Sequence, residues 1–383
     1  MSAAGLRIGV LAGEASGDIL GSRVIAALRH RYPELVVEGI GGPLLKAQGL
    51  DSLFPMERLS VMGFVEPLKR LPELLRTRGA VFEHFRSHPP DLFLGIDSPD
   101  FNLALERKLR AWGVPTAHLV SPTVWAWRRG RIHKIARSVD LMLCLFPFEQ
   151  AIYLEHGIDA RFVGHPLADE VPLQPDQAAA REALGLAADD RVLALLPGSR
   201  SGEVAMLGSL FLETATRLIS RYPGLKVLIP AANAARLSQL RELTAASGSG
   251  AIELVDGRSR EVMLAADAVL MASGTVTLEA LLLKRPMVVA YRMAPLSWAL
   301  VRRLATTPFA ALPNILAGER VVPEFLQEEA TVDNLVSAVG ELLEGGTDPQ
   351  IQRFTEIHQA LRLGFAERSA DALVALAQSH RHG

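Results

Sequence analysis

The chain has 383 residues, of which 49% are hydrophobic and 21% charged, a globular composition long enough for two domains. Forty basic residues nearly balance 42 acidic ones, and the resulting charge of −2 argues against a protein that binds nucleic acid through its overall charge. The single cysteine, Cys144, excludes an internal disulfide, so we expect a reducing, cytoplasmic environment and a buried thiol.

Apolar runs alternate with amphipathic stretches through the first half of the chain. The sequence enters its first apolar run directly, so we expect no signal peptide, and no apolar stretch reaches the roughly 20 residues of a membrane span. The alternation predicts a parallel sheet covered by helices on both faces. Predicted strands span residues 6–11, 35–40, 91–96, 115–120 and 139–146, and predicted helices include 18–31, 101–112 and 147–156.

The first predicted strand leads into the sequence GEASGD at residues 13–18. Gly13 and Gly17 permit close approach of the backbone to a polar ligand. Glu14 and Asp18 suit the hydroxyls of a sugar better than a phosphate. The alternative is an ordinary strand–turn–helix in which Asp18 interacts with the helix dipole.

Two carboxylates follow the strand at 91–96, where parallel sheets usually place their chemistry. Asp100 could cap a helix that begins at Phe101. Pro99 separates Asp97 from that helix, so we favour Asp97 as a general base. On the next strand, His118 could be a second base or a satisfied core histidine, and Trp125 and Trp127 further on could contact a sugar or pack in the core.

Three prolines in residues 164–176 predict a linker, after which the alternation resumes. We therefore predict an α/β protein with two facing Rossmann-like domains, whose strand ends would surround one cleft. The predicted domains are an acceptor-side domain at 1–168, a nucleotide-sugar domain at 169–345, and C-terminal helices at 346–383 that could pack back on the first domain. Predicted strands here span 191–196, 225–229, 252–255, 268–271 and 286–291, with helices at 201–221, 258–265, 275–283 and 296–304.

Two strand-to-helix turns in the second half suit an anion. In the first, Ser199 can donate a hydrogen bond and Arg200 can fork onto a phosphate. In the second, Ser273, Gly274 and Thr275 open a helix, on which Glu279 could accept from ribose hydroxyls. Two such turns at one sheet edge indicate a nucleotide diphosphate, and the absence of a Walker motif argues against kinase or ATPase chemistry.

No group of His, Cys, Asp and Glu has metal-ligand spacing, and no Asp-x-Asp triplet is present. We therefore expect neither a metal nor another cofactor, and helix dipoles and arginines would then stabilise a departing diphosphate. The apolar segment at 311–324, which contains Asn314, could line a ligand or simply connect two elements.

Six motifs, in this order, resemble those of lipid-A-disaccharide synthases, which are glycosyltransferases of the two-Rossmann (GT-B) type. They span residues 12–21, 61–66, 95–102, 121–128, 195–200 and 312–318. The resemblance implies transfer of 2,3-diacylglucosamine from UDP to 2,3-diacylglucosamine 1-phosphate (lipid X), with inversion and a β-1,6 linkage. It also implies a peripheral location on the cytoplasmic face of the inner membrane of Gram-negative bacteria.

The resemblance assigns the base role to Asp97. On the residues alone, Glu14 stays open as the alternative base, and Asp100 is a third candidate catalytic carboxylate. It assigns donor-side roles to a set in the second half: Arg200, Ser273, Thr275, Glu279 and Asn314.

Acylated substrates require a surface that touches lipid, and residues 58–78 combine apolar and basic side chains. The alternative is a core helix whose basic residues face water. The residues expected to contact the membrane are Val61, Met62, Phe64, Val65, Lys69 and Arg70.

Two other functions remain open on the sequence. One is another GT-B enzyme, such as a UDP-N-acetylglucosamine 2-epimerase or an undecaprenyl-linked-sugar transferase. The other is a non-catalytic nucleotide-sugar or lipid-binding protein, against which Asp97 and Glu14 argue. The sequence leaves the oligomeric state open.

Overall fold

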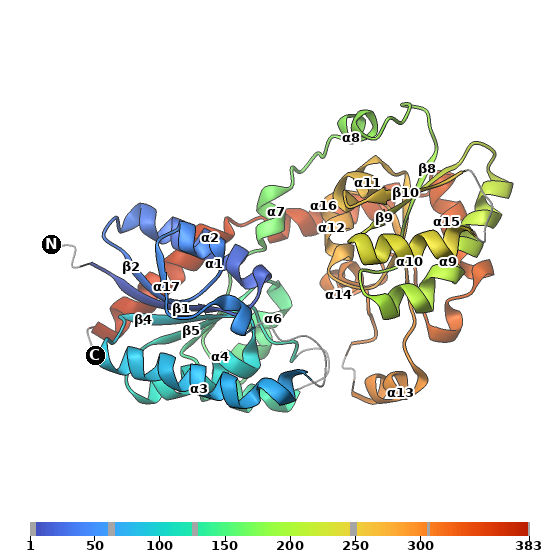
Figure 1. Ribbon diagram of the computed structural model, residues 1–383. Helices are drawn as coiled ribbons and strands as arrows, with labels where there is room; N and C mark the ends of the chain where they lie inside the picture. The colour runs from blue at the N-terminus through green and yellow to red at the C-terminus, as the bar shows by residue number, and fades with distance from the viewer. Residues whose placement is uncertain (1–4, 60–65, 125–128, 246–250, 305–306, 382–383) are drawn as a thin grey trace. The chain divides into compact units, whose positions relative to one another are not determined.

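The computed structural model contains two α/β units, each built on one parallel sheet (Figure 1). Unit 1 comprises Met1–Asp169 and Leu361–Gly383, and unit 2 comprises Glu170–Ala360. The structure describes residues 5–59, 66–124, 129–245, 251–304 and 307–381. The predicted fold class, two parallel α/β domains with a helical C-terminus, is confirmed.

The sheet of unit 1 has the order β3-β2-β1-β4-β5-β6-β7, with every neighbouring pair parallel. The strand order therefore reverses between β1 and β4. The strands are β1 (Arg7–Ala12), β2 (Val36–Ile40), β3 (Leu50–Ser52), β4 (Leu92–Ile96), β5 (Thr116–Leu119), β6 (Leu141–Cys144) and β7 (Ala160–Phe162).

Helices cover both faces of this sheet because successive strand residues point to opposite sides. Ile8 and Val10 of β1 belong to the core that includes α1 and α17, whereas Leu11 and Phe93 belong to the core beneath α3 and α4 (Figure 1). The helices are α1 (Ala15–Arg31), α2 (Pro43–Ala47), α3 (Glu66–Ser87), α4 (Pro99–Ala111), α5 (Ile132–Ala136), α6 (Pro147–Leu154), α7 (Pro166–Glu170) and α17 (Phe365–Arg381), with short 3₁₀ turns at Met56–Arg58 and Arg129–Arg131.

Unit 2 repeats this plan with the strand order β10-β9-β8-β11-β12-β13, which reverses between β8 and β11. Its strands are β8 (Val192–Leu196), β9 (Lys226–Ala231), β10 (Ile252–Asp256), β11 (Ala268–Ala272), β12 (Met287–Tyr291) and β13 (Glu324–Leu326). Its helices are α8 (Gln177–Ala183), α9 (Ser201–Arg221), α10 (Ala234–Ala245), α11 (Ser259–Ala265), α12 (Val276–Leu282), α13 (Pro295–Leu304), α14 (Leu312–Ala317), α15 (Val332–Leu343) and α16 (Asp348–Leu361), with a 3₁₀ turn at Gln327–Glu329.

Two segments differ from the sequence prediction. The predicted linker at 164–176 contains α7, which begins at Pro166, and the segment at 311–324 contains α14, whose first turn contains Pro313. Proline is tolerated in a first helical turn because the N–H groups there have no partner within the helix. A count of prolines therefore overestimated how irregular the predicted linker is.

The C-terminal helices divide between the units. Within the range 346–383, α16 belongs to unit 2, and only residues from Leu361 onward belong to unit 1. There α17 packs on α1, where Arg31 forms ion pairs with Glu367 and Asp371.

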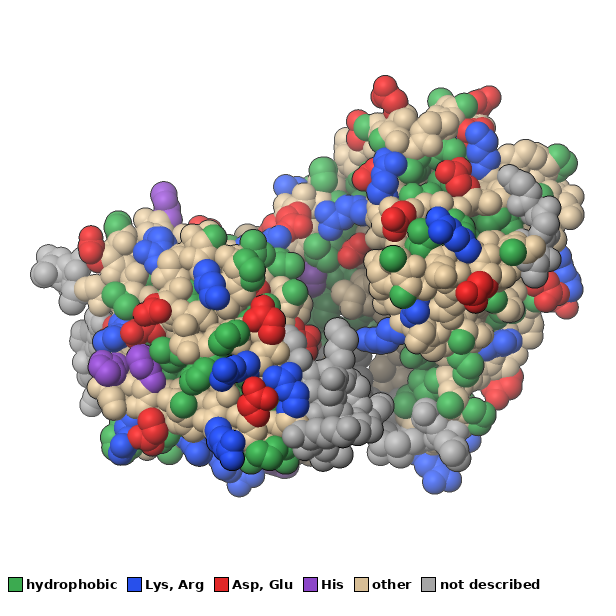
Figure 2. Space-filling view, viewed as in Figure 1, with side chains coloured by type: hydrophobic (Ala, Val, Ile, Leu, Met, Phe, Trp, Pro, Cys, Tyr) green, Lys and Arg blue, Asp and Glu red, His purple; other side chains and the backbone are tan. Residues whose placement is uncertain are grey.

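The surface agrees with the balanced composition. On the face drawn in Figure 2, basic and acidic side chains are interspersed over both units. Within the described ranges, no helix combines the length and apolar character needed to cross a bilayer.

Candidate active site

The polar loops found in the sequence follow the strands that flank the two reversal points. In unit 1, Glu14 comes after β1 and Asp97 after β4. In unit 2, Arg200 comes after β8 and Ser273 after β11. Open parallel sheets bind ligands outside the carboxyl ends of their strands where the strand order reverses. Each unit therefore has its candidate residues where its topology favours a ligand.

Asp97 occupies a backbone conformation that few non-glycine residues adopt. Its φ is 50° and that of Ser98 is 43°, in the left-handed region that costs roughly 1–2 kcal/mol per residue. The Asp97 N–H donates to Leu119 O at 2.9 Å, which anchors the turn to β5. Such strain is retained where the surrounding structure holds it, often at functional sites.

Glu14 lies at the neighbouring loop with an exposed side chain. It is the N-cap residue of α1 in an extended conformation, but its carboxylate makes no capping hydrogen bond. A Cβ atom added to Gly13 would lie 2.7 Å from Ser98 Oγ, so the loops after β1 and β4 are in close contact. A side chain at position 13 would therefore require Ser98 to shift.

The alternative in which Asp100 caps a helix beginning at Phe101 is wrong. Helix α4 begins at Pro99, and its N-cap residue is Ser98, so Pro99 starts the helix instead of separating Asp97 from it. The Asp100 side chain is 80% exposed and accepts a hydrogen bond at 2.6 Å from Arg131 Nη2.

Asp18 has a structural role that differs from both roles considered on the sequence. Its buried carboxylate accepts hydrogen bonds from the backbone N–H groups of Gly42, Leu44 and Leu45, at 2.8, 2.9 and 3.0 Å. It therefore caps α2 across the unit, not its own helix α1.

His118 is completely buried in β5, so its placement does not favour direct contact with a substrate. Its Nδ1 lies 2.7 Å from Oε1 of Glu106 on α4, which is also completely buried. Burial raises the pKa of Glu106, and the nearby imidazole opposes that change. Trp125 and Trp127 lie outside the described residues.

The loop after β8 in unit 2 already holds a carboxylate. Glu203 Oε2 accepts from the N–H groups of Ser199 and Arg200, at 3.0 and 3.2 Å, and Glu203 Oε1 lies 3.1 Å from Arg200 Nη1. Two backbone donors and a guanidinium thus converge on one anionic group. Gly198 permits this approach, with φ at 128° and a hypothetical Cβ only 2.4 Å from Glu203 Cβ.

A pocket of about 420 Å³ opens at this loop and at the loop after β11. The expected donor residues Ser199, Arg200, Ser273, Gly274 and Thr275 all line it. Ser273 Oγ donates to Ala310 O at 2.8 Å, which fixes the loop against residues preceding α14.

Glu279 and Asn314 do not line that pocket. Glu279 is half-buried on α12, and burial raises the pKa of its carboxyl group. Asn314 is completely buried and donates to Val322 O at 3.0 Å, while its Oδ1 accepts from the N–H groups of Val321 and Val322. Asn314 therefore organises the turn that leads to β13.

A sequence model of the lipid-A-disaccharide synthetases matches residues 8–377. The Pseudomonas aeruginosa lipid-A-disaccharide synthase is 53% identical over 374 residues, which cover 98% of this chain and 99% of the relative. That of Saccharophagus degradans is 52% identical over 379 residues, with 98% of each chain covered. The chain belongs to the lipid-A-disaccharide synthase family. It is accordingly a glycosyltransferase.

Solved structures with low sequence identity share the fold. The UDP-N-acetylglucosamine 2-epimerase of Neisseria meningitidis, bound to UDP-N-acetylglucosamine, has a TM-score of 0.62 at 12% identity and covers 99% of this chain and 100% of its own. The corresponding epimerase of Methanocaldococcus jannaschii has a TM-score of 0.61 at 13% identity, with 97% and 100% covered. At these identities the similarity concerns the fold alone.

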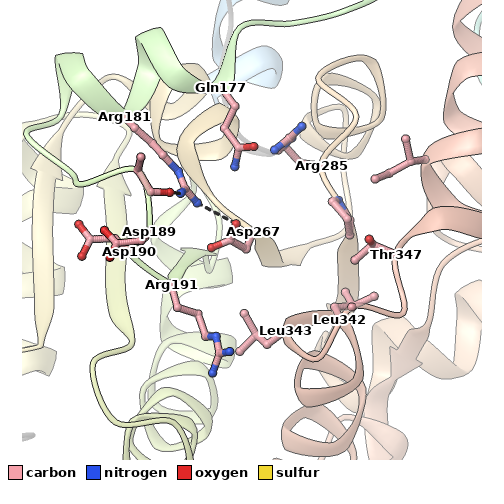
Figure 3. A pocket seen from close by; sticks show the side chains of 14 residues that line it. Gln177, Arg181, Asp189, Asp190, Arg191, Asp267, Arg285, Leu342, Leu343 and Thr347 are labelled. Atoms are coloured by element: carbon pink, nitrogen blue, oxygen red, sulfur yellow. Dashed lines mark hydrogen bonds and ion pairs between the residues drawn. The ribbon is translucent and has the colours of Figure 1, made fainter.

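A second pocket, of about 450 Å³, lies at the amino ends of the strands of unit 2 (Figure 3). Arg181 forms an ion pair with Asp267 at 2.7 Å and donates to Ala265 O at 3.0 Å, and Arg285 donates to Leu283 O at 3.1 Å. These arginines satisfy carbonyls at the carboxyl ends of α11 and α12, a role that basic side chains commonly have there. Helix capping thus explains the arginines in this pocket. The pocket also lies away from the carboxyl ends of the strands, where parallel sheets bind ligands.

Most of the expected membrane-contact residues lie outside the part of the chain that the structure describes. Val61, Met62, Phe64 and Val65 lie outside the described residues, as does the side chain of Lys69. Arg70 donates to Arg58 O at 3.1 Å and pairs with Glu73 at 3.3 Å. Further along α3, Leu71 and Leu75 are 47% and 48% exposed.

Within the described ranges, no three His, Cys, Asp or Glu side chains are grouped so that they could hold a metal ion.

Proposed function

We propose that the protein transfers 2,3-diacylglucosamine from UDP to the 6-hydroxyl of 2,3-diacylglucosamine 1-phosphate (lipid X), with inversion. The products are the β-1,6 disaccharide 1-phosphate and UDP. Membership of the lipid-A-disaccharide synthase family supports this proposal. The structural observation that carries it concerns one loop in each unit, beside the reversal of strand order. In unit 1 the loop contains Asp97, and in unit 2 the loop directs the N–H groups of Ser199 and Arg200 at a carboxylate.

Unit 2 binds the donor. The carboxylate of Glu203 marks where the N–H groups of Ser199 and Arg200 converge on negative charge. A diphosphate oxygen offers the same chemistry with more charge, and Ser273, Gly274 and Thr275 line the same pocket. The half-buried Glu279 accepts from ribose hydroxyls, and Asn314 acts indirectly, by holding the turn before β13.

Unit 1 supplies the base. The acceptor hydroxyl is a very weak acid, so a carboxylate must take its proton as its oxygen attacks the anomeric carbon. Asp97 performs this step, and the exposed Glu14 and Asp100 orient the acceptor through hydrogen bonds to its hydroxyls. His118 does not contact the acceptor; its contact with Glu106 holds α4 against β5.

The bond changes need no covalent enzyme intermediate. The oxygen of the acceptor forms the new bond, the bond from the anomeric carbon to the UDP oxygen breaks, and Asp97 receives the proton. The negative charge that develops on UDP is stabilised by Arg200 and by backbone N–H groups of unit 2. One displacement inverts the configuration at the anomeric carbon.

The substrates implied by the family are acylated, so we place the protein peripherally on the cytoplasmic face of the inner membrane. The exposed Leu71 and Leu75 on α3 offer apolar surface, and Arg76 beside them is also exposed. In the sequence, Val61, Met62, Phe64 and Val65 extend the same apolar segment, with Lys69 and Arg70 as flanking basic residues.

Product analysis separates this proposal from its alternatives. The purified protein should release UDP and form disaccharide only when both acylated substrates are present. An epimerase would convert UDP-N-acetylglucosamine in the absence of an acceptor, and a binding protein would bind UDP without turnover. Either result, without disaccharide formation, would refute the proposed transfer.

A further inference from the structure

A cluster of buried polar side chains lies directly beneath the turn that presents Asp97. Asn102 and Glu106 lie one helical turn apart on α4, and His118 is the register partner of Gly95 in the adjacent strand. All three side chains are 0% exposed. Burying polar groups is unfavourable unless they make specific hydrogen bonds, so this cluster needs an explanation that core packing alone does not give.

The amide of Asn102 holds the backbone on which both candidate carboxylates depend. Its Nδ2 donates to Asp97 O at 2.8 Å and also lies 3.2 Å from Ile96 O and 3.4 Å from Leu11 O. Asp97 and Ile96 belong to the end of β4, whereas Leu11 belongs to β1, which leads to Glu14. One side chain thus joins the two strand ends at the reversal point.

We propose that Asn102 is a positioning residue that holds Asp97 in its left-handed conformation, so that the carboxylate is oriented toward the acceptor hydroxyl. The proposal rests on the proposed role of Asp97 as the base. Asn102 acts through the backbone and does not itself touch a substrate.

The surrounding residues fix the position of Asn102. Its helix is pinned to β5 by the contact between Glu106 and His118, at 2.7 Å. A Cβ atom at Gly95 would lie 2.0 Å from Glu106 Oε1 and 3.1 Å from Asn102 Cβ, so only glycine permits α4 to approach β4 this closely. Three features of the motif at residues 95–102 therefore serve one arrangement: the glycine, the left-handed turn and the asparagine.

The donor hydrogens of Asn102 distinguish it from an isosteric aspartate. An ionised carboxylate cannot donate and would face the carbonyl oxygens of Asp97, Ile96 and Leu11, and a protonated carboxyl group has only one donor hydrogen where the amide has two. Asn102→Asp therefore keeps the volume but weakens the hold on the turn, and Asn102→Ser provides a second variant that retains one donor on a shorter side chain.

A matched control loses a comparable bond far from this turn. Thr116 is also completely buried in unit 1 and donates to Ser138 O at 3.1 Å, but it lies at the amino end of β5. Thr116→Val should lower the melting temperature while leaving kcat within about threefold of the wild type.

The test is a double-mutant cycle between positions 97 and 102, with full-length protein and both acylated substrates. We expect Asn102→Asp to lower kcat about 10- to 100-fold, with KM for the donor and Kd for UDP changed less than about threefold. In the Asp97→Asn background the same substitution should lower kcat by less than about threefold, because the group that it positions is already absent. If Asn102→Asp does not fold, as judged by circular dichroism and melting, Asn102→Ser takes its place in the cycle.

Three outcomes would overturn the proposal, and they are distinguishable. An equal loss of kcat in both backgrounds, or a loss no larger than that of Thr116→Val, would show that Asn102 only stabilises unit 1. If Asp97→Asn alone retains near-wild-type kcat, the assignment of the base fails first, and the positioning role fails with it.

Discussion

At the scale of single residues, the same carboxylate chemistry has different uses in this protein. Asp18 is buried and caps α2, Asp100 is exposed and pairs with Arg131, and Asp97 lies in a strained turn at a strand end. The sequence favoured Asp97 as the base, but through a wrong reason, because Pro99 proved to be the first residue of α4. The partner of Asp18 lies 24 residues away at Gly42, a contact that local sequence rules could not predict.

Arg200 is the residue on which donor binding should depend most. Its side chain is 84% exposed and its cation lies beside the Glu203 carboxylate, so it is available to a phosphate. Arg200→Ala should weaken UDP binding by about 2 kcal/mol, the usual contribution of a charge-assisted hydrogen bond. Isothermal titration calorimetry measures this change. Arg217→Ala, which removes an exposed arginine on the same helix, is the matched control, and equal UDP affinity in both variants would refute the role of Arg200.

His165 should make stability depend on pH. Burial lowers the pKa of His165 from 6.5 to about 4, and its ring stacks on Phe146 at 5.5 Å. The unfolded chain therefore takes up a proton that the folded chain excludes, and stability falls as the pH drops from about 6.5 toward 4.

Denaturant unfolding at about pH 7.5 and pH 5 tests this dependence. The wild type should lose about 2 kcal/mol more than His165→Gln over that interval. His156→Gln, which changes an exposed histidine, should behave like the wild type. An identical loss in the wild type and His165→Gln would show that the folded protein does not exclude the proton.

At the scale of elements, strong patterns were predictable and short ones were not. Buried strands such as β4 and β8 are continuous apolar runs, and the predicted limits of α9 agree with the structure. The three-residue strands β3, β7 and β13 lie at sheet edges and are too short to show a periodic pattern. Their pairing depends on neighbours that are distant in sequence.

Helix α3 carries the surface that we expect to contact lipid. Leu71 and Leu75 lie one turn apart and are both about half exposed, although exposed leucines are unfavourable in water. Replacing both with serine should lower binding to anionic phospholipid vesicles about tenfold, while UDP affinity stays unchanged.

Vesicle sedimentation is the measurement, and Leu154→Ser is the control because Leu154 is 52% exposed on a different helix of unit 1. Wild-type sedimentation of the double variant would place the lipid contact elsewhere. A similar loss in the control would show that vesicle binding falls when any exposed leucine is replaced by serine.

At the scale of the whole molecule, the sequence predicted two parallel α/β domains because strands and helices alternate twice. It also predicted part of the lining of the pocket at the loops after β8 and β11, since Ser199, Arg200, Ser273, Gly274 and Thr275 follow closely after these strands. The sequence alone did not distinguish candidate side chains that are buried from those that a ligand can reach. His118 and Asn314 resemble ligand-binding residues in sequence, yet both are completely buried: His118 contacts Glu106 on α4, and Asn314 bonds to the backbone of Val321 and Val322 in the turn before β13.

If the protein itself stabilises the negative charge of the departing diphosphate, sugar transfer should not require a metal ion. Arg200 and the backbone N–H groups of the loop after β8 supply positive electrostatic potential where the diphosphate should bind. The rate of transfer should therefore be unchanged in excess EDTA. A rate that falls with the chelator and returns with Mg²⁺ would refute this prediction.

The central claim is a division of labour, in which unit 1 supplies the base and unit 2 binds the donor. The most direct test is the single-turnover rate of Asp97→Asn with both acylated substrates bound, compared with Asp100→Asn. We predict that Asp97→Asn lowers this rate about 10²- to 10⁴-fold with UDP affinity unchanged, because the amide preserves shape but cannot accept the proton. Asp100→Asn should stay within about tenfold of the wild type. A rate for Asp97→Asn within a few-fold of the wild type would contradict the claim.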